Sequence, residues 1–500
     1  MNLPNLKNPH IFQQVGYVNS KSLNNCDQLL LILSSKPATD GLKKLPHGDK
    51  IKKLLQKSSS SSTPDFTTRL PNSKQTLVVG KVVSKDSSVF DQLTLGRELI
   101  AKTSREYTGS LGICVIGFEN ELSQSIYNNI LAAALAAAFQ LPSFKLKKSK
   151  PLIKSIHILG IEKKIDTSRT EAEAMGNNLA RWLAIMPPNI LDATNYSKLI
   201  KLLSNKNDWS LKQYKTKELS KLGAGAFLAV AQGNENDSAS IIRLRYRPNG
   251  KRKKADISLV GKGIIFDTGG TNLKPFQYML NMHGDMQGSA VALGTLLAIS
   301  QLQLPIAVDC WLAITENRTG PKAYKSEDVI TALNGKTIQT VHTDAEGRMV
   351  LADTLTLASR EKPGIIFDYA TLTGSCVTAI TSYYSGIFTN REDLHSRLTL
   401  IGQNCGERVW PFPVDKEFMA DLKSDTADML QCSPKAPGDH ILAANFLAEF
   451  IENNTPWVHM DLSAGHNEKG LGHINSKFTG FGVRFTLSAI LDEKLLEAKL

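Results

Sequence analysis

The chain has 500 residues, too many for one ordinary hydrophobic core, and we expect two domains. Apolar residues make up 42% and charged residues 21%, as in globular proteins. No apolar run reaches the roughly 18 residues needed to cross a bilayer, and the first residues do not resemble a secretion signal. The six scattered cysteines form no CxxC pair, which is typical of a reducing compartment. We therefore expect a cytoplasmic protein with no membrane partner.

The positive charge is unevenly distributed along the sequence. Residues 1–165 hold 23 Lys and Arg against 11 Asp and Glu, a net charge of +12, whereas the remainder is balanced at 36 against 36. A basic segment of this kind can attract nucleic acid. No helix-turn-helix, zinc-finger or aromatic-rich RNA-binding motif accompanies it. A solvated basic surface is the simpler explanation, and DNA binding is a weaker alternative.

The sequence before residue 65 shows little regular patterning. We expect residues 1–64 to be loosely ordered, with the serine run at 58–62 acting as a connector. Three elements are predicted after it: strands at Leu77–Val83 and Ile113–Phe118, and a helix at Glu121–Gln140. This alternation indicates an N-terminal α/β domain over residues 1–165.

A long helical pattern follows at Asp166–Met186, where Pro187 and Pro188 end it. We interpret residues 166–190 as a connecting helix and 191–500 as a second, larger domain. Its predicted strands are Ile241–Tyr246, Ile257–Phe266, Ile306–Thr315 and Ile365–Tyr369, and its predicted helices include Ser289–Gln301 and Met349–Ala358. The pattern favours a mostly parallel sheet covered by helices, which binds ligands beyond the carboxyl ends of its strands.

A lysine interrupts one of these apolar strands. Lys262 is costly to bury unless it is neutral or paired, and a neutral amine can bind a metal ion. A salt-bridged lysine is the simpler explanation. The strand ends at Asp267, and the glycine turn after it matches neither nucleotide-binding pattern.

Two charged residues follow that turn. Lys274 stands alone, and Asp285 opens a helix of small apolar residues. An acid at that position is ordinarily a helix cap. A metal ligand is the alternative.

A third group spans His342 to Arg348. Because Gly347 disfavours a helix, we expect an extended backbone that points Asp344, Glu346 and Arg348 to one face. These side chains could form a structural ion network. They could equally hold divalent cations, with the arginine binding an anion.

Together the three groups favour metal chemistry over the simpler readings. They supply four carboxylates, enough to hold two metal ions about 3.5–4 Å apart. Lys262 completes a ligand set, and Lys274 and Arg348 supply positive charge for a developing oxyanion.

These stretches closely resemble the leucine aminopeptidase family (M17 peptidases) over roughly residues 165–490. The two most specific motifs are Gly261–Pro275 and Thr343–Arg348. The resemblance implies an α/β fold of two domains, each with a mixed, mostly parallel sheet flanked by helices. The smaller N-terminal domain would be macro-like and the larger one catalytic. It also implies a homohexamer.

The resemblance further implies a role for each metal-binding residue. Asp267 and Glu346 would bridge two ions, Asp344 would bind one ion, and Lys262 and Asp285 the other. Zinc or manganese is expected, with cobalt or magnesium as alternatives.

The remaining site residues are also assigned by resemblance. Lys274 would polarise the scissile carbonyl, and Arg348 would hold a bicarbonate ion that accepts a proton from the attacking water. Met282, Thr371 and Gly374 would form the pocket for the first side chain. The implied activity is release of N-terminal amino acids from peptides, broad but favouring Leu and Met. A DNA-binding protein that uses the basic N-terminal domain is the alternative.

Overall fold

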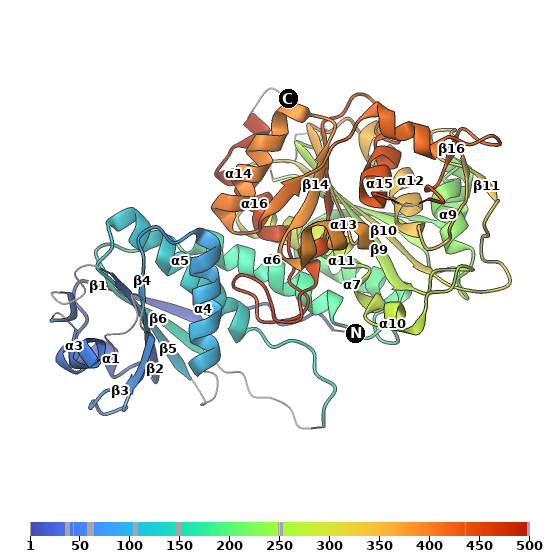
Figure 1. Cartoon of the computed structure of the whole chain (residues 1–500). Coiled ribbons are helices and arrows are strands. Elements are labelled where there is room, and N and C mark those ends of the chain that lie inside the picture. The colour runs from blue at the N-terminus through green and yellow to red at the C-terminus, as the bar shows by residue number, and fades with distance from the viewer. Residues whose placement is uncertain are drawn as a thin grey trace. The chain divides into compact units, whose positions relative to one another are not determined.

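The computed structural model describes residues 2–35, 41–43, 45–57, 65–103, 109–146, 153–248, 250, 254–435 and 437–497. The chain divides into two compact units (Figure 1). The smaller unit comprises Leu6–Ala174 and Lys469–Asn475, and the larger comprises Met1–Asn5, Met175–Glu468 and Ser476–Leu500. The predicted serine connector lies outside the described residues. In the described part of the chain, no helix has the length and apolarity to span a bilayer. All six cysteines are buried and free.

The smaller unit contains a six-stranded sheet in the order β1-β6-β5-β2-β4-β3, parallel throughout except where β3 meets β4. Its strands are β1 His10–Val15, β2 Gln28–Ser34, β3 Asp65–Arg69, β4 Leu77–Val83, β5 Ser110–Ile116 and β6 Ser155–Ile161. Its helices include α1 Ser20–Leu23, α3 Gly48–Lys57, α4 Val89–Thr103 and α5 Asn120–Ala138. Leu30 and Ile32 pack with α4 and α5, whereas Leu29 and Leu31 pack on the other face with α1 and α3. Helices therefore flank both faces of the sheet.

The position of β2 corrects the expectation that residues 1–64 are loosely ordered. Every residue of β2 is buried, and the strand pairs with β5 on one side and β4 on the other. The run Leu29–Leu33 is uniformly apolar because a central parallel strand is buried on both faces. The run lacks the apolar–polar alternation of a half-exposed strand and is surrounded by polar residues. A strand was therefore not predicted there from the sequence.

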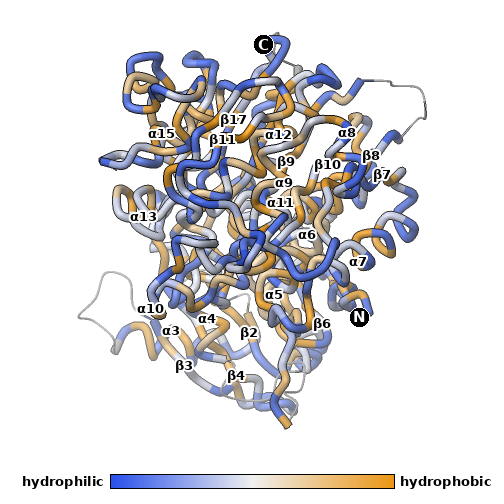
Figure 2. The backbone as a smooth tube through the Cα atoms, turned by 90° about the vertical axis from the view of Figure 1, so that its right-hand side faces the viewer, coloured by the Kyte–Doolittle hydropathy of each residue, from blue (hydrophilic) through white to orange (hydrophobic). Residues whose placement is uncertain are grey.

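The larger unit is built on an eight-stranded mixed sheet in the order β15-β14-β17-β13-β9-β10-β8-β7. Its strands are β7 Ser210–Lys215, β8 Ser240–Tyr246, β9 Ile257–Asp267, β10 Val308–Asn317, β13 Ile365–Ala370, β14 Ser385–Thr389, β15 Val409–Pro411 and β17 Trp457–Asp461. The central strands β17, β13, β9 and β10 run parallel, and β9 and β10 are largely hydrophobic (Figure 2). A small sheet of β11 Val329–Thr331, β12 Thr337–Gln339 and β16 Met429–Leu430 accompanies it.

The larger unit also contains helices, the first of which, α6, begins in the smaller unit. They are α6 Ser168–Ala184, α7 Ala193–Lys206, α8 Thr216–Leu222, α9 Gly225–Ala231, α10 Phe276–Met279, α11 Gln287–Gln301, α12 Glu346–Arg360, α13 Gly374–Ile380, α14 His395–Cys405, α15 Asp439–Ala448 and α16 Val483–Leu491. Helix α11 packs against β9 and against α16, and α12 packs against β9, α9 and α15. The predicted α/β class, with mixed, mostly parallel sheets flanked by helices, is confirmed. The predicted strands and helices are present close to their expected ends.

Candidate functional site

The site begins on the central strand β9. Lys262 lies in the middle of this strand and Asp267 at its carboxyl end, and both are buried. Parallel strands β13 and β10 flank β9, so the carboxyl ends of three neighbouring strands meet at one edge of the sheet. This is the edge at which open α/β sheets bind ligands.

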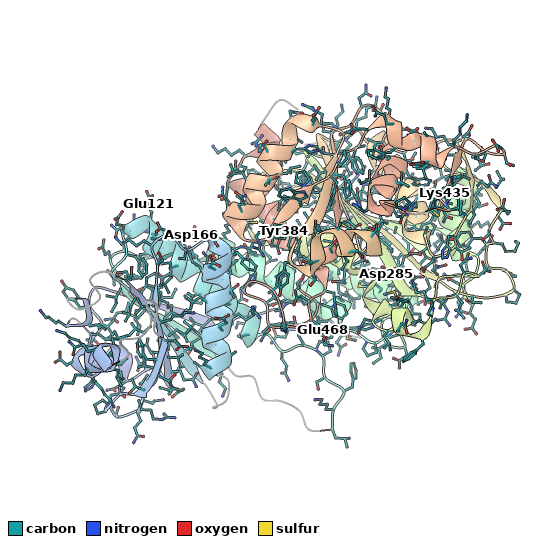
Figure 3. All side chains as sticks on the ribbon, viewed as in Figure 1. Glu121, Asp166, Asp285, Tyr384, Lys435 and Glu468 are labelled. Carbon is teal, nitrogen blue, oxygen red and sulfur yellow. The ribbon has the colours of Figure 1, made fainter. Side chains whose placement is uncertain are left out.

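Acidic side chains from separate segments of the chain converge on this edge. Asp267, Asp344 and Glu346 each offer a carboxylate oxygen, and these oxygens lie within 4.8 Å of one another. Lys262 Nζ lies 2.9 Å from Glu346 Oε1 and 2.9 Å from Asp285 Oδ1, so Asp285 joins the same cluster (Figure 3 labels Asp285). The structure therefore brings together all five residues predicted as metal ligands.

Lys274 lies on another side of the carboxylates. Its Nζ is 2.9 Å from Asp267 Oδ2 and also pairs with Asp344. Its side chain is only 13% exposed. Two lysines therefore face four carboxylates, which leaves an excess of negative charge in a largely buried volume.

The pKa values reflect that crowding. Burial raises the pKa of Asp285 and of Glu346, and neighbouring carboxylates raise both further. Burial alone would lower the pKa of Lys262, but the charges of Asp285, Glu346 and Asp267 outweigh it and raise that pKa. A neutral Lys262 amine therefore requires a cation close by.

The donor set fits divalent cations. Several carboxylate oxygens and one amine are ligands that zinc, manganese and related ions accept. Asp285 Oδ1 accepts hydrogen bonds from Lys262 and, at 2.7 Å, from Thr371 Oγ1, whereas its buried Oδ2 has no hydrogen-bond partner. An unpaired buried carboxylate oxygen is costly, and a bound cation would satisfy it. Asp285 makes no capping bond to α11, so the simpler helix-cap reading is wrong.

The expected extended backbone from Asp344 to Arg348 is wrong. Helix α12 begins at Glu346, so Glu346 and Arg348 lie in its first turn and Asp344 in the turn before it. Gly347 is tolerated there because the helix passes very close to the lysine. A Cβ at this position would lie 2.8 Å from Lys262 Cε and Nζ. Asp344 and Glu346 still reach the cluster, whereas Arg348 points to other partners.

Arg348 is buried and its terminal nitrogens are engaged. Nη2 lies 2.8 Å from both carboxylate oxygens of Asp439, and Nη1 donates to the carbonyl of Gln431 at 3.1 Å. Burial would lower the pKa of Arg348, but the charge and hydrogen bonds of Asp439 raise it. Bicarbonate at this guanidinium would have to compete with Asp439, so the residues present do not fit that ion. Sequence reasoning missed Asp439, because a lone acid at the start of a helix reads as a helix-dipole charge.

Asn317 was also missed. This residue ends β10, beside Asp267 at the end of β9. Its Nδ2 donates to Asp267 Oδ1 at 2.8 Å and to the Thr343 carbonyl at 3.0 Å, and lies 3.4 Å from Glu346 Oε2. Its place two residues after the predicted strand Ile306–Thr315 was the available indication.

The predicted substrate-pocket residues are placed less uniformly. Thr371 lies inside the cluster, because its carbonyl also accepts a hydrogen bond from Lys262 at 2.9 Å. Met282 is half-buried in the short turn before Asp285. Gly374 is exposed at the start of α13, with open space where a Cβ would point. Their contact with a substrate side chain stays a prediction.

Three comparisons show which known proteins this chain is similar to. The family model "Cytosol aminopeptidase family, catalytic domain" matches residues 178–487. A probable cytosol aminopeptidase of Aquifex aeolicus is 36% identical over 384 residues, covering 76% of this chain and 77% of that protein. Another, from Wolbachia pipientis wMel, is 32% identical over 446 residues, covering 87% and 86%. The solved structure of a tomato leucine aminopeptidase mutant aligns over 98% of both chains with a TM-score of 0.84 at 24% identity, a similarity of fold.

Proposed function

Because the chain belongs to the cytosol aminopeptidase family, we propose that it uses two divalent metal ions to hydrolyse the first peptide bond of peptides. The observation that supports this proposal is the convergence of four carboxylates and Lys262 at the carboxyl end of β9. A bound cation would also satisfy the buried Asp285 Oδ2, which has no hydrogen-bond partner.

The proposal assigns each ligand to one metal ion or to both. Asp267 and Glu346 would bridge the two ions, Asp344 would bind one, and Lys262 and Asp285 would bind the other. When bound, such ions polarise a carbonyl and make water nucleophilic near neutral pH. Zinc or manganese is the expected metal, and cobalt or magnesium would also suit the donor set.

The chain's own residues then orient the substrate. Lys274 is the partly exposed cation beside the cluster. It would hold the oxygen of the scissile carbonyl as charge develops on it. Met282, Thr371 and Gly374 would form an apolar pocket for the first side chain. Because one methylene changes binding by only about 1–3 kcal/mol, the preference for Leu and Met should be broad.

A homohexamer and a cytosolic location are part of the same proposal. They rest on the family resemblance and on the names of the relatives. Light scattering of the purified protein tests the hexamer. The basic residues 1–165 keep DNA binding as the alternative function, which a salt-dependent shift of duplex DNA would support.

The decisive experiment is a panel of fluorogenic amino-acid amides on chelator-treated protein, with metals returned one at a time. We expect release of Leu and Met amides only after metal is restored. Asp344→Ala and Glu346→Ala should lose both the activity and bound metal, counted by mass spectrometry. Asp393→Ala, an exposed acid paired with Arg391, is the control. Protein that holds two metal ions yet releases no N-terminal residue would refute the proposal.

A further inference from the structure

The contact between Arg348 and Asp439 bears on which group accepts the proton of the attacking water. We propose that the Asp439 carboxylate permanently occupies the anion position on Arg348, so that the chain supplies internally the group that bicarbonate would otherwise provide. This proposal rests on the proposed peptidase function for its catalytic consequence. The occupancy of the guanidinium does not depend on that function.

The geometry is that of an anion held by an arginine. Both Asp439 oxygens lie 2.8 Å from Arg348 Nη2, and the guanidinium is almost fully buried. A carboxylate and a bicarbonate present the same planar pair of oxygens to such a group. A second anion would place two negative charges on one buried cation, close to the carboxylate of Glu346. Repulsion at low dielectric opposes that arrangement.

Asp439 is held in place from its own side of the contact. It is the first residue of α15, where the helix dipole favours a negative charge. The next residue, His440, binds Ser375 Oγ twice, through its backbone N–H at 2.8 Å and its Nδ1 at 3.1 Å. The ring of Phe412 packs edge-on against His440, with ring centroids 4.6 Å apart. The carboxylate is therefore positioned before any substrate arrives.

Gln431 connects the Arg348–Asp439 pair to the loop that carries Asp344. Gln431 accepts a hydrogen bond from Arg348 at its backbone carbonyl. Its side chain accepts from the backbone N–H of His342 at 3.1 Å and donates to the carbonyl of Ala345 at 3.1 Å. These residues flank Asp344, so Gln431 ties the ion pair to the loop that carries a predicted ligand.

The proposed step conserves atoms and charge. The attacking water gives a proton to an Asp439 oxygen as its own oxygen bonds to the carbonyl carbon. When the C–N bond breaks, the electron pair remains on nitrogen, and the proton passes from Asp439 to that amine. Asp439 is then ionised again, and Arg348 stays protonated throughout.

Two variants of Asp439 test the proposal. Asp439→Ala opens the anion position, and Asp439→Asn keeps it filled by a neutral group of the same shape. In carbon-dioxide-free buffer we expect wild-type hydrolysis to be unchanged by added bicarbonate. We expect both variants to lose about 100-fold in kcat, the scale of a proton-transfer group. Bicarbonate should restore Asp439→Ala by about 10-fold or more and should not restore Asp439→Asn.

A second readout is independent of activity. In metal-free protein, bicarbonate should raise the unfolding temperature of Asp439→Ala, because it binds the folded state alone, and should leave that of the wild type unchanged. Glu452→Ala is the matched control, since Glu452 pairs with Arg360 through two 2.9 Å contacts elsewhere on the surface. If neither the wild type nor either variant hydrolyses peptides while Asp439→Ala alone gains this stabilisation, the result supports the anion site and refutes the peptidase function. A wild type that needs bicarbonate, or an Asp439→Ala variant that ignores it in both assays, would overturn the proposal.

Discussion

Asn317 and Asp267 end neighbouring parallel strands, and the Asn317 amide donates a 2.8 Å hydrogen bond to Asp267 Oδ1. The same nitrogen also holds the Thr343 carbonyl, one residue before Asp344. One buried amide therefore fixes the distance between the strand that carries one carboxylate and the loop that carries another. Groups that orient metal ligands in this way commonly determine metal affinity.

Replacing Asn317 by Ala should weaken metal binding by about 10- to 100-fold, because the ligands lose their fixed orientation. Competition with a chromogenic chelator measures this directly. Asn234→Ala is the control, since its amide donates to Thr315 on the same strand without touching the cluster. Equal metal affinities in Asn317→Ala and the wild type would contradict the orienting role.

Gly347→Ala should separate folding from metal binding. Alanine is the better helix former by about 1 kcal/mol, so the helix itself should tolerate the change. The new Cβ would nevertheless meet Lys262 Cε and Nζ at 2.8 Å and push the amine away from Glu346. We expect a native circular dichroism spectrum with reduced metal content. Unchanged metal content would mean that Lys262 is not a ligand.

Much of this architecture could be predicted from the sequence. The family resemblance is confirmed, and so is the α/β class, because apolar strands such as β9 and β13 alternate with amphipathic or small-residue helices. The five predicted ligands do converge. Local apolar patterns predicted the elements, whereas the ligand set was predicted from the motifs and the family resemblance.

The failures share a physical cause, which is that the decisive contact lies far away in the sequence. On the local sequence alone, Gly347 predicts a break in the helix. The glycine is needed because Lys262 lies so close that a Cβ would clash with it. In the sequence, Asp439 resembles an acid that interacts only with a helix dipole. Its partner Arg348 lies 91 residues earlier in the chain. The strand β2 lacks alternation because sheet neighbours and helices bury both of its faces. Periodicity within a segment carries no information about such partners.

Lys274→Met should lower kcat while leaving metal binding largely intact. The side chain keeps its length but loses the charge that would stabilise a developing oxyanion, an effect of about 100- to 1,000-fold. Activity against a Leu amide, together with metal content, distinguishes this role from a ligand role. Lys325→Met, which removes an exposed lysine paired with Asp328, serves as the control. Loss of metal in Lys274→Met would assign the residue to structural charge balance instead.

The stability of the larger unit should depend on pH through His459 and Asp368. Both side chains are fully buried, and His459 Nδ1 lies 2.6 Å from Asp368 Oδ1. Burial would lower the pKa of His459, but the charge and hydrogen bond of Asp368 raise it above the ordinary value. Because the folded pKa exceeds the unfolded value of about 6.5, the pair stabilises fully below that pH, and its contribution declines as pH rises through the folded pKa. The difference in unfolding free energy between wild type and His459→Gln should therefore shrink from pH 6 towards pH 9. Urea titration measures this difference. The variant His10→Gln, which replaces an exposed histidine, is the control and should show no such trend. A wild-type advantage that stays constant across this range would mean that His459 does not change its proton occupancy on folding.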